Sequence, residues 1–158
     1  MTVASSAVEP TRNSLVNLLN YLETAYPNFR FKVGNRFKFC YPNQISLENP
    51  ENSAIPPAFF ALQTLHELGH ALCKHKDYNT DVSRLKIERA AWEAAKTAYE
   101  KLPDDLRNTF KWDKDYVEDS LDTYRDWLHK KSTCKTCGLT CYQTPDGKWH
   151  CPRCENFI

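Results

Sequence analysis

Two histidines and a glutamate lie close together in the order His66-Glu67-x-x-His70. On a helix, residues four apart share one face, so both imidazoles could hold one metal ion. Glu67 would lie beside that ion, where its carboxylate could take a proton from water. The alternative is an amphipathic helix with two solvated histidines. We interpret the stretch as a catalytic zinc site in which His66 and His70 are ligands and Glu67 is the catalytic base.

Such a site needs a third protein ligand, and the helix predicted over 82–101 offers Glu88 and Glu93. At about 100° per residue, Glu88 falls in the middle of the apolar side, whereas Glu93 falls among charged residues on the opposite side. A carboxylate among apolar groups needs compensation, which a divalent cation would give. The alternative compensation is a buried salt bridge to Arg84. We predict Glu88 as the third zinc ligand.

Two other residues near the motif are not predicted to bind the metal. His75 follows His70 by five residues, whereas the extended motif H-E-x-x-H-x-x-G-x-x-H requires six. We expect His75 to be a cation at the helix end, and the less favoured alternative is a donor near the substrate. Cys73 falls on the metal-facing side, two turns below His66, and is predicted to pack there as a small buried thiol.

Four cysteines near the C-terminus form two C-x-x-C pairs separated by residues 138–150, with a Pro-Asp-Gly turn between them. Four thiolates at this spacing are typical of a closed tetrahedral zinc site, and unrelated dithiols or disulfides are the alternative. So short a segment cannot fold on apolar burial alone, so the metal must supply most of its folding free energy. Cys141 is surplus and is expected to pack. The predicted structural zinc ligands are Cys134, Cys137, Cys151 and Cys154.

The elements that must position these groups follow from apolar periodicity. The sequence predicts an α+β fold, mostly helical, with a small antiparallel sheet whose first two strands form a hairpin around Gly34-Asn35. Asp81 is the predicted N-cap of the third helix. We expect a flexible tail over 1–12, one core domain over 13–131 and a zinc ribbon over 132–158. Helices are predicted at 13–26, 57–74, 82–101, from 104 and at 114–131, and strands at 29–33, 37–41 and 45–47.

Composition narrows the class without naming a partner. The 158 residues carry a formal net charge of +1, too little to gather nucleic acid or acidic membranes. The N-terminus has no secretion-signal pattern, and no apolar run is long enough to span a bilayer. The odd number of cysteines, seven, fits reduced thiols that bind metal better than a disulfide scaffold. We expect a soluble cytoplasmic protein that does not enter membranes.

The stretch His66–His70, together with Glu88-Arg-Ala-Ala-Trp-Glu-Ala-Ala95, resembles the ImmA/IrrE-type zincin metallopeptidases and the related peptidase-like domain of ArdC antirestriction proteins. The resemblance covers about residues 13–101, and the second segment is similar to that group's Glu-x-Glu-Ala-x-x-x-Ala helix. The group's second Glu falls on Ala90 here, which leaves Glu88 as the aligned acid. SprT-like proteases also join this motif to a zinc ribbon, but their third histidine lies farther downstream than His75, and no histidine occurs here between His75 and His129.

The resemblance implies a zinc metallopeptidase, with a zincin-like core, that acts on a protein or peptide. We expect a regulatory or stress-related endopeptidase with two Zn2+ ions, one catalytic and one structural. One alternative is an antirestriction or nucleic-acid-associated binding protein that keeps the zincin core as a scaffold. Another is a deformylase-like hydrolase, whose motif works with a cysteine ligand. Nucleic acid or a protein could contact the ribbon through Tyr142, Lys148 and Trp149, although Trp149 could instead cover the small core.

Overall fold

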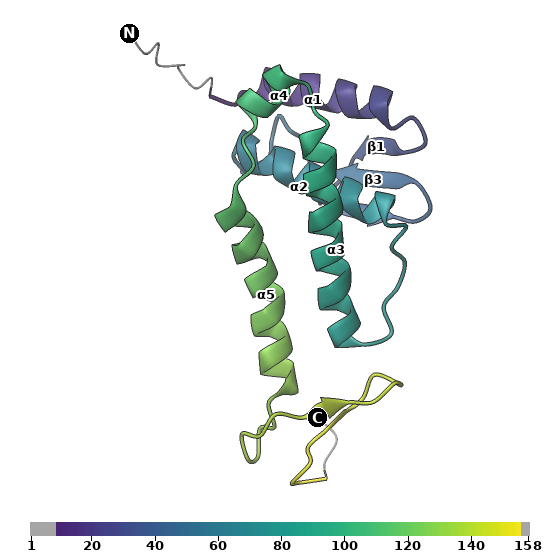
Figure 1. Cartoon of the computed structure of the whole chain (residues 1–158), viewed down its shortest axis with the longest axis vertical. Coiled ribbons are helices and arrows are strands. Elements are labelled where there is room, and N and C mark those ends of the chain that lie inside the picture. Colours follow the sequence, from purple (N-terminus) through teal and green to yellow (C-terminus); the bar gives the residue numbers. More distant parts are fainter. Residues whose placement is uncertain (1–8, 156–158) are drawn as a thin grey trace. The chain divides into compact units, whose positions relative to one another are not determined.

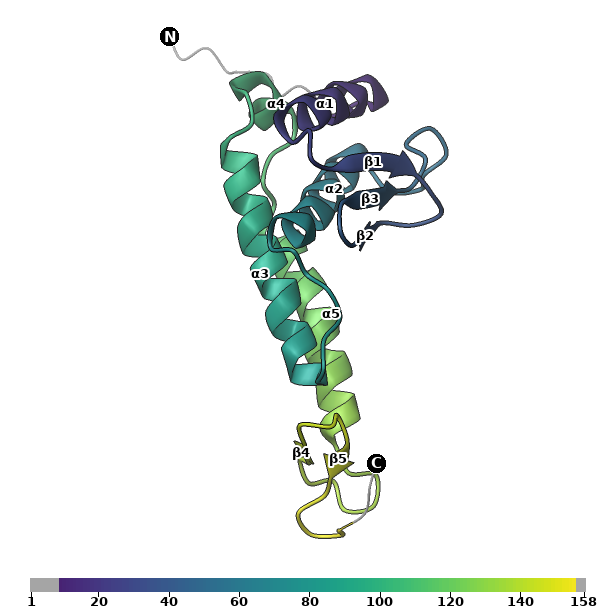
Figure 2. The ribbon, with the colours of Figure 1, turned by 90° about the vertical axis from the view of Figure 1, so that its right-hand side faces the viewer.

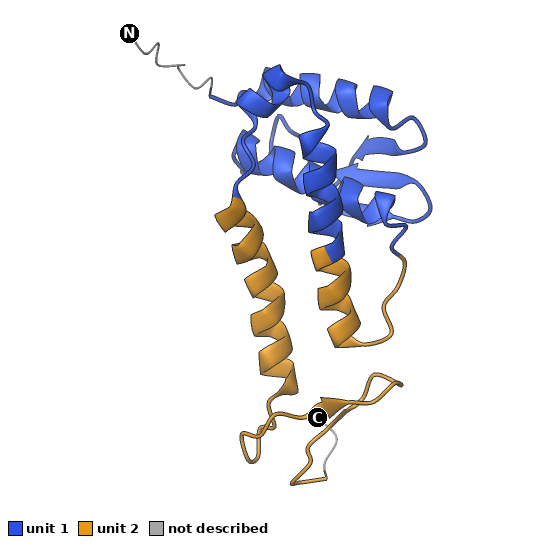
Figure 3. Ribbon diagram, viewed as in Figure 1, with its two compact units in different colours: residues 1–75, 90–113 blue, residues 76–89, 114–158 orange. Residues whose placement is uncertain are grey.

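The structure, a computed structural model, describes residues 9–155 and divides into two compact units (Figure 3). The first unit comprises residues 1–75 and 90–113, and the second comprises 76–89 and 114–158. Most of the predicted flexible tail over 1–12 lies outside the described residues. Within the described part of the chain, no helix combines the length and apolar character needed to cross a membrane. The predicted α+β class is confirmed.

Helix α1 (Arg12–Ala25) begins at the capping box formed by Thr11 and Ser14. The Ser14 amide donates to Thr11 Oγ1 at 3.2 Å, and the Thr11 amide donates to Ser14 Oγ. These bonds satisfy two amides that a helix start leaves without intrahelical partners. The buried face carries Leu15, Leu18 and Leu22 at helical spacing, as the periodicity predicts.

The three-stranded sheet has a different order from the one predicted. Its strands are β1 (Arg30–Val33), β2 (Lys38–Cys40) and β3 (Gln44–Leu47). Strand β3 lies between the other two, parallel to β1 and antiparallel to β2 (Figure 2). The predicted hairpin between the first two strands is therefore wrong, and the sheet is mixed and not antiparallel.

Burial explains this order. Ile45 and Leu47 of β3 are 0% and 3% exposed, whereas the residues of β1 and β2 are exposed or half-buried. The strand with the most completely buried side chains thus takes the most sheltered position, at the centre. The Gly34 amide donates to the Leu47 carbonyl at 2.7 Å, which prolongs the β1–β3 ladder where a hairpin turn was expected.

Helix α2 (Pro57–Leu72) is buried over most of its length and contacts α1, β2 and β3 (Figure 1). Its first turn carries Pro57, whose missing amide donor costs little there. Helix α3 (Asp81–Glu100) follows, and α4 (Asp104–Thr109) is a short helix. A Cβ atom added at Gly69 of α2 would lie 2.0 Å from the Ala91 carbonyl oxygen of α3. Gly69 therefore permits the close approach of these two helices.

The second unit contains the first turns of α3, helix α5 (Lys114–Ser132) and the two-stranded sheet of β4 (Tyr142–Gln143) and β5 (Trp149–His150). The N-cap of α3 is Thr80 and not the predicted Asp81, because Thr80 Oγ1 accepts the Ser83 amide at 3.1 Å. Asp81 is instead the first helical residue. Its carboxylate is engaged by other side chains, so it does not cap the helix.

Candidate metal centres

Helix α2 places His66 and His70 on one face, with their Nε2 atoms 3.2 Å apart. Zinc–nitrogen bonds of about 2.0–2.1 Å at tetrahedral angles put two nitrogen ligands about 3.3 Å apart. The imidazole of His66 is 5% exposed and stacks on the indole of Trp92, with ring centroids 4.2 Å apart. The pair is therefore set at the separation that two ligands of one zinc ion require.

Glu88 of α3 joins this pair. Its side chain is 8% exposed, and one ligand atom from each of His66, His70 and Glu88 lies within 4.8 Å of the others. On the same helix, Glu88 lies three residues before Ala91, whose carbonyl group faces Gly69. The structure thus brings together the three predicted ligands, and the group could hold a metal ion such as zinc.

Tyr124 of α5 is a neighbour of Glu88 that the sequence did not identify. Burial, followed by the charge of Glu88, raises the pKa of Tyr124 to about 12, and the two side chains are hydrogen-bonded. Arg84, the salt-bridge partner considered for Glu88, places its guanidinium 5.2 Å from the Tyr124 ring centroid and 5.1 Å from that of Trp127. In sequence, Tyr124 belongs to the apolar stripe of α5, which gives no sign that its hydroxyl meets a carboxylate.

Glu67, the residue after His66 on α2, is buried, at 8% exposure. Its Oε2 atom accepts a hydrogen bond from the Phe39 amide of β2 at 2.5 Å. Phe39 stands opposite Ile45 of β3, but its N–H group points to Glu67 and away from that strand. Because β2 is an edge strand of the sheet, the predicted catalytic base is held at the sheet's edge.

The two residues that were not predicted as ligands lie at the end of α2. His75 Nδ1 is 2.9 Å from His70 Nδ1, so His75 contacts a ligand of the His66–His70–Glu88 group without being part of it. Cys73 is exposed, so its prediction as a buried thiol is wrong. The helix ends at Leu72, and position 73 therefore leaves the buried face. The Cys73 thiol donates to the Ala90 carbonyl at 3.7 Å.

The four predicted ribbon cysteines form a second group, and their sulfurs lie within 4.8 Å of one another. The two C-x-x-C segments have the same backbone form. The Gly138 amide donates to the Cys134 carbonyl at 2.8 Å, the Glu155 amide donates to the Cys151 carbonyl at 3.1 Å, and both donor residues have positive φ. Hydrogen bonds from backbone amides, first that of Cys137 and then that of Thr136, lower the pKa of Cys134 to about 6. The pKa of Cys154 is instead raised to about 12, chiefly by its contact with the Cys137 side chain. Four sulfurs gathered in this way could hold a zinc ion, which would bind them as thiolates.

Cys141 and Trp149 are buried with Cys134 and Cys151 in a small cluster, against which Leu128 packs. The prediction that Cys141 packs is therefore confirmed, and of the two roles considered for Trp149 the structure shows the second, as part of the small core. Since Trp149 is 5% exposed, a surface contact through its ring is not supported, whereas Tyr142 is 56% exposed.

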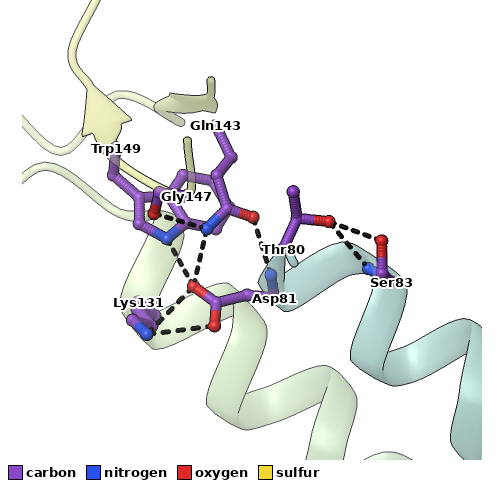
Figure 4. Close-up of polar contacts among 7 residues, drawn as sticks. All are labelled: Thr80, Asp81, Ser83, Lys131, Gln143, Gly147 and Trp149. Atoms are coloured by element: carbon purple, nitrogen blue, oxygen red, sulfur yellow. Dashed lines mark hydrogen bonds and ion pairs between the residues drawn. The ribbon is translucent and has the colours of Figure 1, made fainter. Parts of the chain in front are cut away.

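Asp81 links strands β4 and β5 to the start of α3 within the second unit (Figure 4). Its Oδ2 atom accepts hydrogen bonds from Trp149 Nε1 at 2.7 Å and from Gln143 Nε2 at 2.9 Å, and it pairs with Lys131 Nζ at 2.9 Å. The Asp81 amide also donates to Gln143 Oε1 at 2.8 Å. Burial by itself would raise the pKa of Asp81, but these bonds outweigh it and lower the pKa.

Comparisons with family models, curated proteins and solved structures return no match for this chain. The resemblance to zincin metallopeptidases therefore stays a prediction.

Proposed function

We propose that this chain is a zinc-dependent metallopeptidase whose reaction takes place at the His66–His70–Glu88 group. The observation that carries the proposal is a buried carboxylate on α3 that meets two imidazoles whose Nε2 atoms lie 3.2 Å apart. Two neutral imidazoles and one carboxylate are the ligand set of several catalytic zinc sites, and they leave a fourth position open. Zinc bound there would supply a Lewis acid that polarises the scissile carbonyl and lowers the pKa of water.

Glu67 is the proposed proton carrier. It follows His66 directly, so its carboxylate lies at the same turn of α2 as the ligands. The hydrogen bond from the Phe39 amide holds Oε2 in place and keeps the carboxylate in one orientation. In that orientation Glu67 would take a proton from the attacking water and return it to the leaving amine. The bond between carbonyl carbon and nitrogen would break in the second step.

The substrate would be an extended peptide aligned with β2. Edge strands bind extended chains through their outward-pointing amides and carbonyls. The Phe39 amide points out of the sheet but already donates to Glu67, so a substrate strand would pair with the other outward-facing groups of this edge, close to that carboxylate. A substrate strand beside β2 would therefore run past the proposed base, which supports a peptide over a small molecule as substrate.

Replacement of Glu67 by Gln tests this function. The variant should keep two equivalents of zinc and lose cleavage of a proteome-derived peptide library, read by mass spectrometry as new termini. Glu93→Gln is the matched control, because Glu93 is an exposed carboxylate on α3 and should leave cleavage unchanged. Cleavage that survives Glu67→Gln, or its absence from the zinc-loaded wild type, would leave the binding-protein alternative.

The deformylase-like alternative gains no support from Cys73. That thiol is exposed and bonds the Ala90 carbonyl, while the metal-binding group is completed by Glu88. A zinc count distinguishes the two ligands directly. Glu88→Ala should remove one zinc equivalent, and Cys73→Ala should remove none.

A further inference from the structure

Helix α2 ends in a turn in which a lysine takes a backbone conformation that glycine usually adopts. The His75 amide donates to the His70 carbonyl at 3.0 Å, and the Lys74 amide donates to the Ala71 carbonyl at 3.0 Å. This pair of bonds is a Schellman motif, in which the residue after the C-cap adopts the left-handed conformation. That residue is usually glycine, but here it is Lys74 with φ of +54°. A strained lysine at this position turns the chain back toward His70.

The turn brings the imidazole of His75 onto the imidazole of His70. Their Nδ1 atoms are 2.9 Å apart, and the ring centroids are 5.0 Å apart at an interplanar angle of 71°. The same two residues thus share a backbone bond and a side-chain bond. The Schellman motif therefore holds the backbones of His70 and His75 at the distance at which their side chains meet.

Metal binding would decide where the protons of these two rings lie. A metal ion bound at His70 Nε2, which faces His66 Nε2, would leave the proton of that ring on Nδ1, and His75 Nδ1 would then accept a hydrogen bond from it. Histidine ligands commonly donate their second N–H to a carboxylate, a carbonyl or water, which fixes the tautomer and raises the ligand's basicity.

We propose that His75 is a positioning residue that orients His70 as a metal ligand through the bond between their Nδ1 atoms. His66 is held differently, by burial and by its stack on Trp92. His70 is half-buried, so packing restrains its ring less, and a polar partner takes over that task. The inference rests on the metal site of the proposed function but not on peptide cleavage.

The test is the affinity of the full-length protein for the zinc equivalent that Glu88→Ala removes, measured by competition with a chromophoric chelator. His75→Ala should weaken that affinity about 10–100-fold, as loss of such an outer partner typically does. His75→Asn places an oxygen acceptor where Nδ1 was and should restore most of it. Lys74→Gly relaxes the turn and should leave the zinc affinity unchanged. His129→Ala, on α5, is the control for the loss of one imidazole from the protein.

A spectroscopic readout separates positioning from a purely structural role. In nitrogen NMR spectra of the zinc-loaded protein, His70 Nδ1 should carry a proton whose signal survives in His75→Asn and is lost in His75→Ala. Unchanged zinc affinity in His75→Ala, or equal losses in the Ala and Asn variants, would overturn the proposal. If zinc affinity falls as expected while the wild type cleaves no peptide, the proposed function fails and the role of His75 stands. A wild type that lacks this zinc overturns both.

Discussion

Because Gly69 lies against the Ala91 carbonyl group, Gly69→Ala should push α2 and α3 apart and disrupt the His66–His70–Glu88 group. In Gly69→Ala the new Cβ would lie 2.0 Å from the Ala91 carbonyl oxygen and 2.9 Å from its carbonyl carbon. Ordinary contact begins at about 3.4 Å, so α2 and α3 would have to separate by about 1.4 Å. Metal sites require ligand distances within about 0.2 Å of their ideal values. Glu88 would thus be carried out of reach of the histidine pair.

The sign of the stability change tests the same reasoning. Helix propensity alone would make Gly69→Ala stabilising by about 1 kcal/mol. Overpacking costs about 1–3 kcal/mol, and because the obstructing atom belongs to the backbone, we expect a value at the upper end. The net result should be a loss of about 1–2 kcal/mol, measured by denaturant unfolding of the metal-free protein, together with loss of one zinc equivalent.

A second substitution guards against a misleading result. Ala91→Gly should not rescue Gly69→Ala, because the clash is with the carbonyl group and not with the side chain of residue 91. A Gly69→Ala protein that is more stable than wild type and binds its full complement of zinc would refute the argument. The helices would then not be fixed by this contact.

Two further predictions concern the metals and the ribbon. Wild type should bind two zinc equivalents, and Glu88→Ala and Cys134→Ser should each lose one, measured by elemental analysis after gel filtration. Asp81→Asn should flatten the acid side of the stability profile, followed by thermal unfolding between neutral pH and pH 3. Since hydrogen bonds lower the pKa of Asp81 in the folded state, its contribution to stability is complete above the unfolded value, about 3.9, and is lost as the pH falls through the folded value. An identical pH profile in Asp81→Asn would show that the charge of the Asp81 carboxylate does not contribute to the stability of the folded protein.

Periodicity and chain chemistry predicted the helices well. The apolar spacing in α1 and α2 places their bounds within two residues of those observed. The phase of α3 also indicated that Glu88 is buried, because a helical wheel needs only the local sequence. The local sequence pattern was enough to predict which side chains are buried wherever a single helix sets their directions.

The sequence predicted less where two distant segments compete for one place. Pairing of the first two strands is the shortest connection, but β3 displaced β2 from β1 because Ile45 and Leu47 bury more completely. Asp81 fits an N-cap by residue type. Its carboxylate instead accepts hydrogen bonds from Gln143 and Trp149, which lie more than sixty positions away in the sequence. The hydrogen bond of Tyr124 to Glu88 is likewise set by packing between helices, which no single-helix pattern encodes.

The bond between Glu67 and the Phe39 amide bears on how an inactive form of this protein should be made. Strand β2 has only three residues, too few to hold its alignment firmly, and a shift by one position would turn the Phe39 amide away from the carboxylate. Glu67, the residue proposed to transfer the proton, thus also holds in register the strand that would bind the substrate. A Glu67→Ala protein would lose chemistry and strand alignment together. The Gln variant, which keeps an oxygen for the amide, removes the chemistry alone.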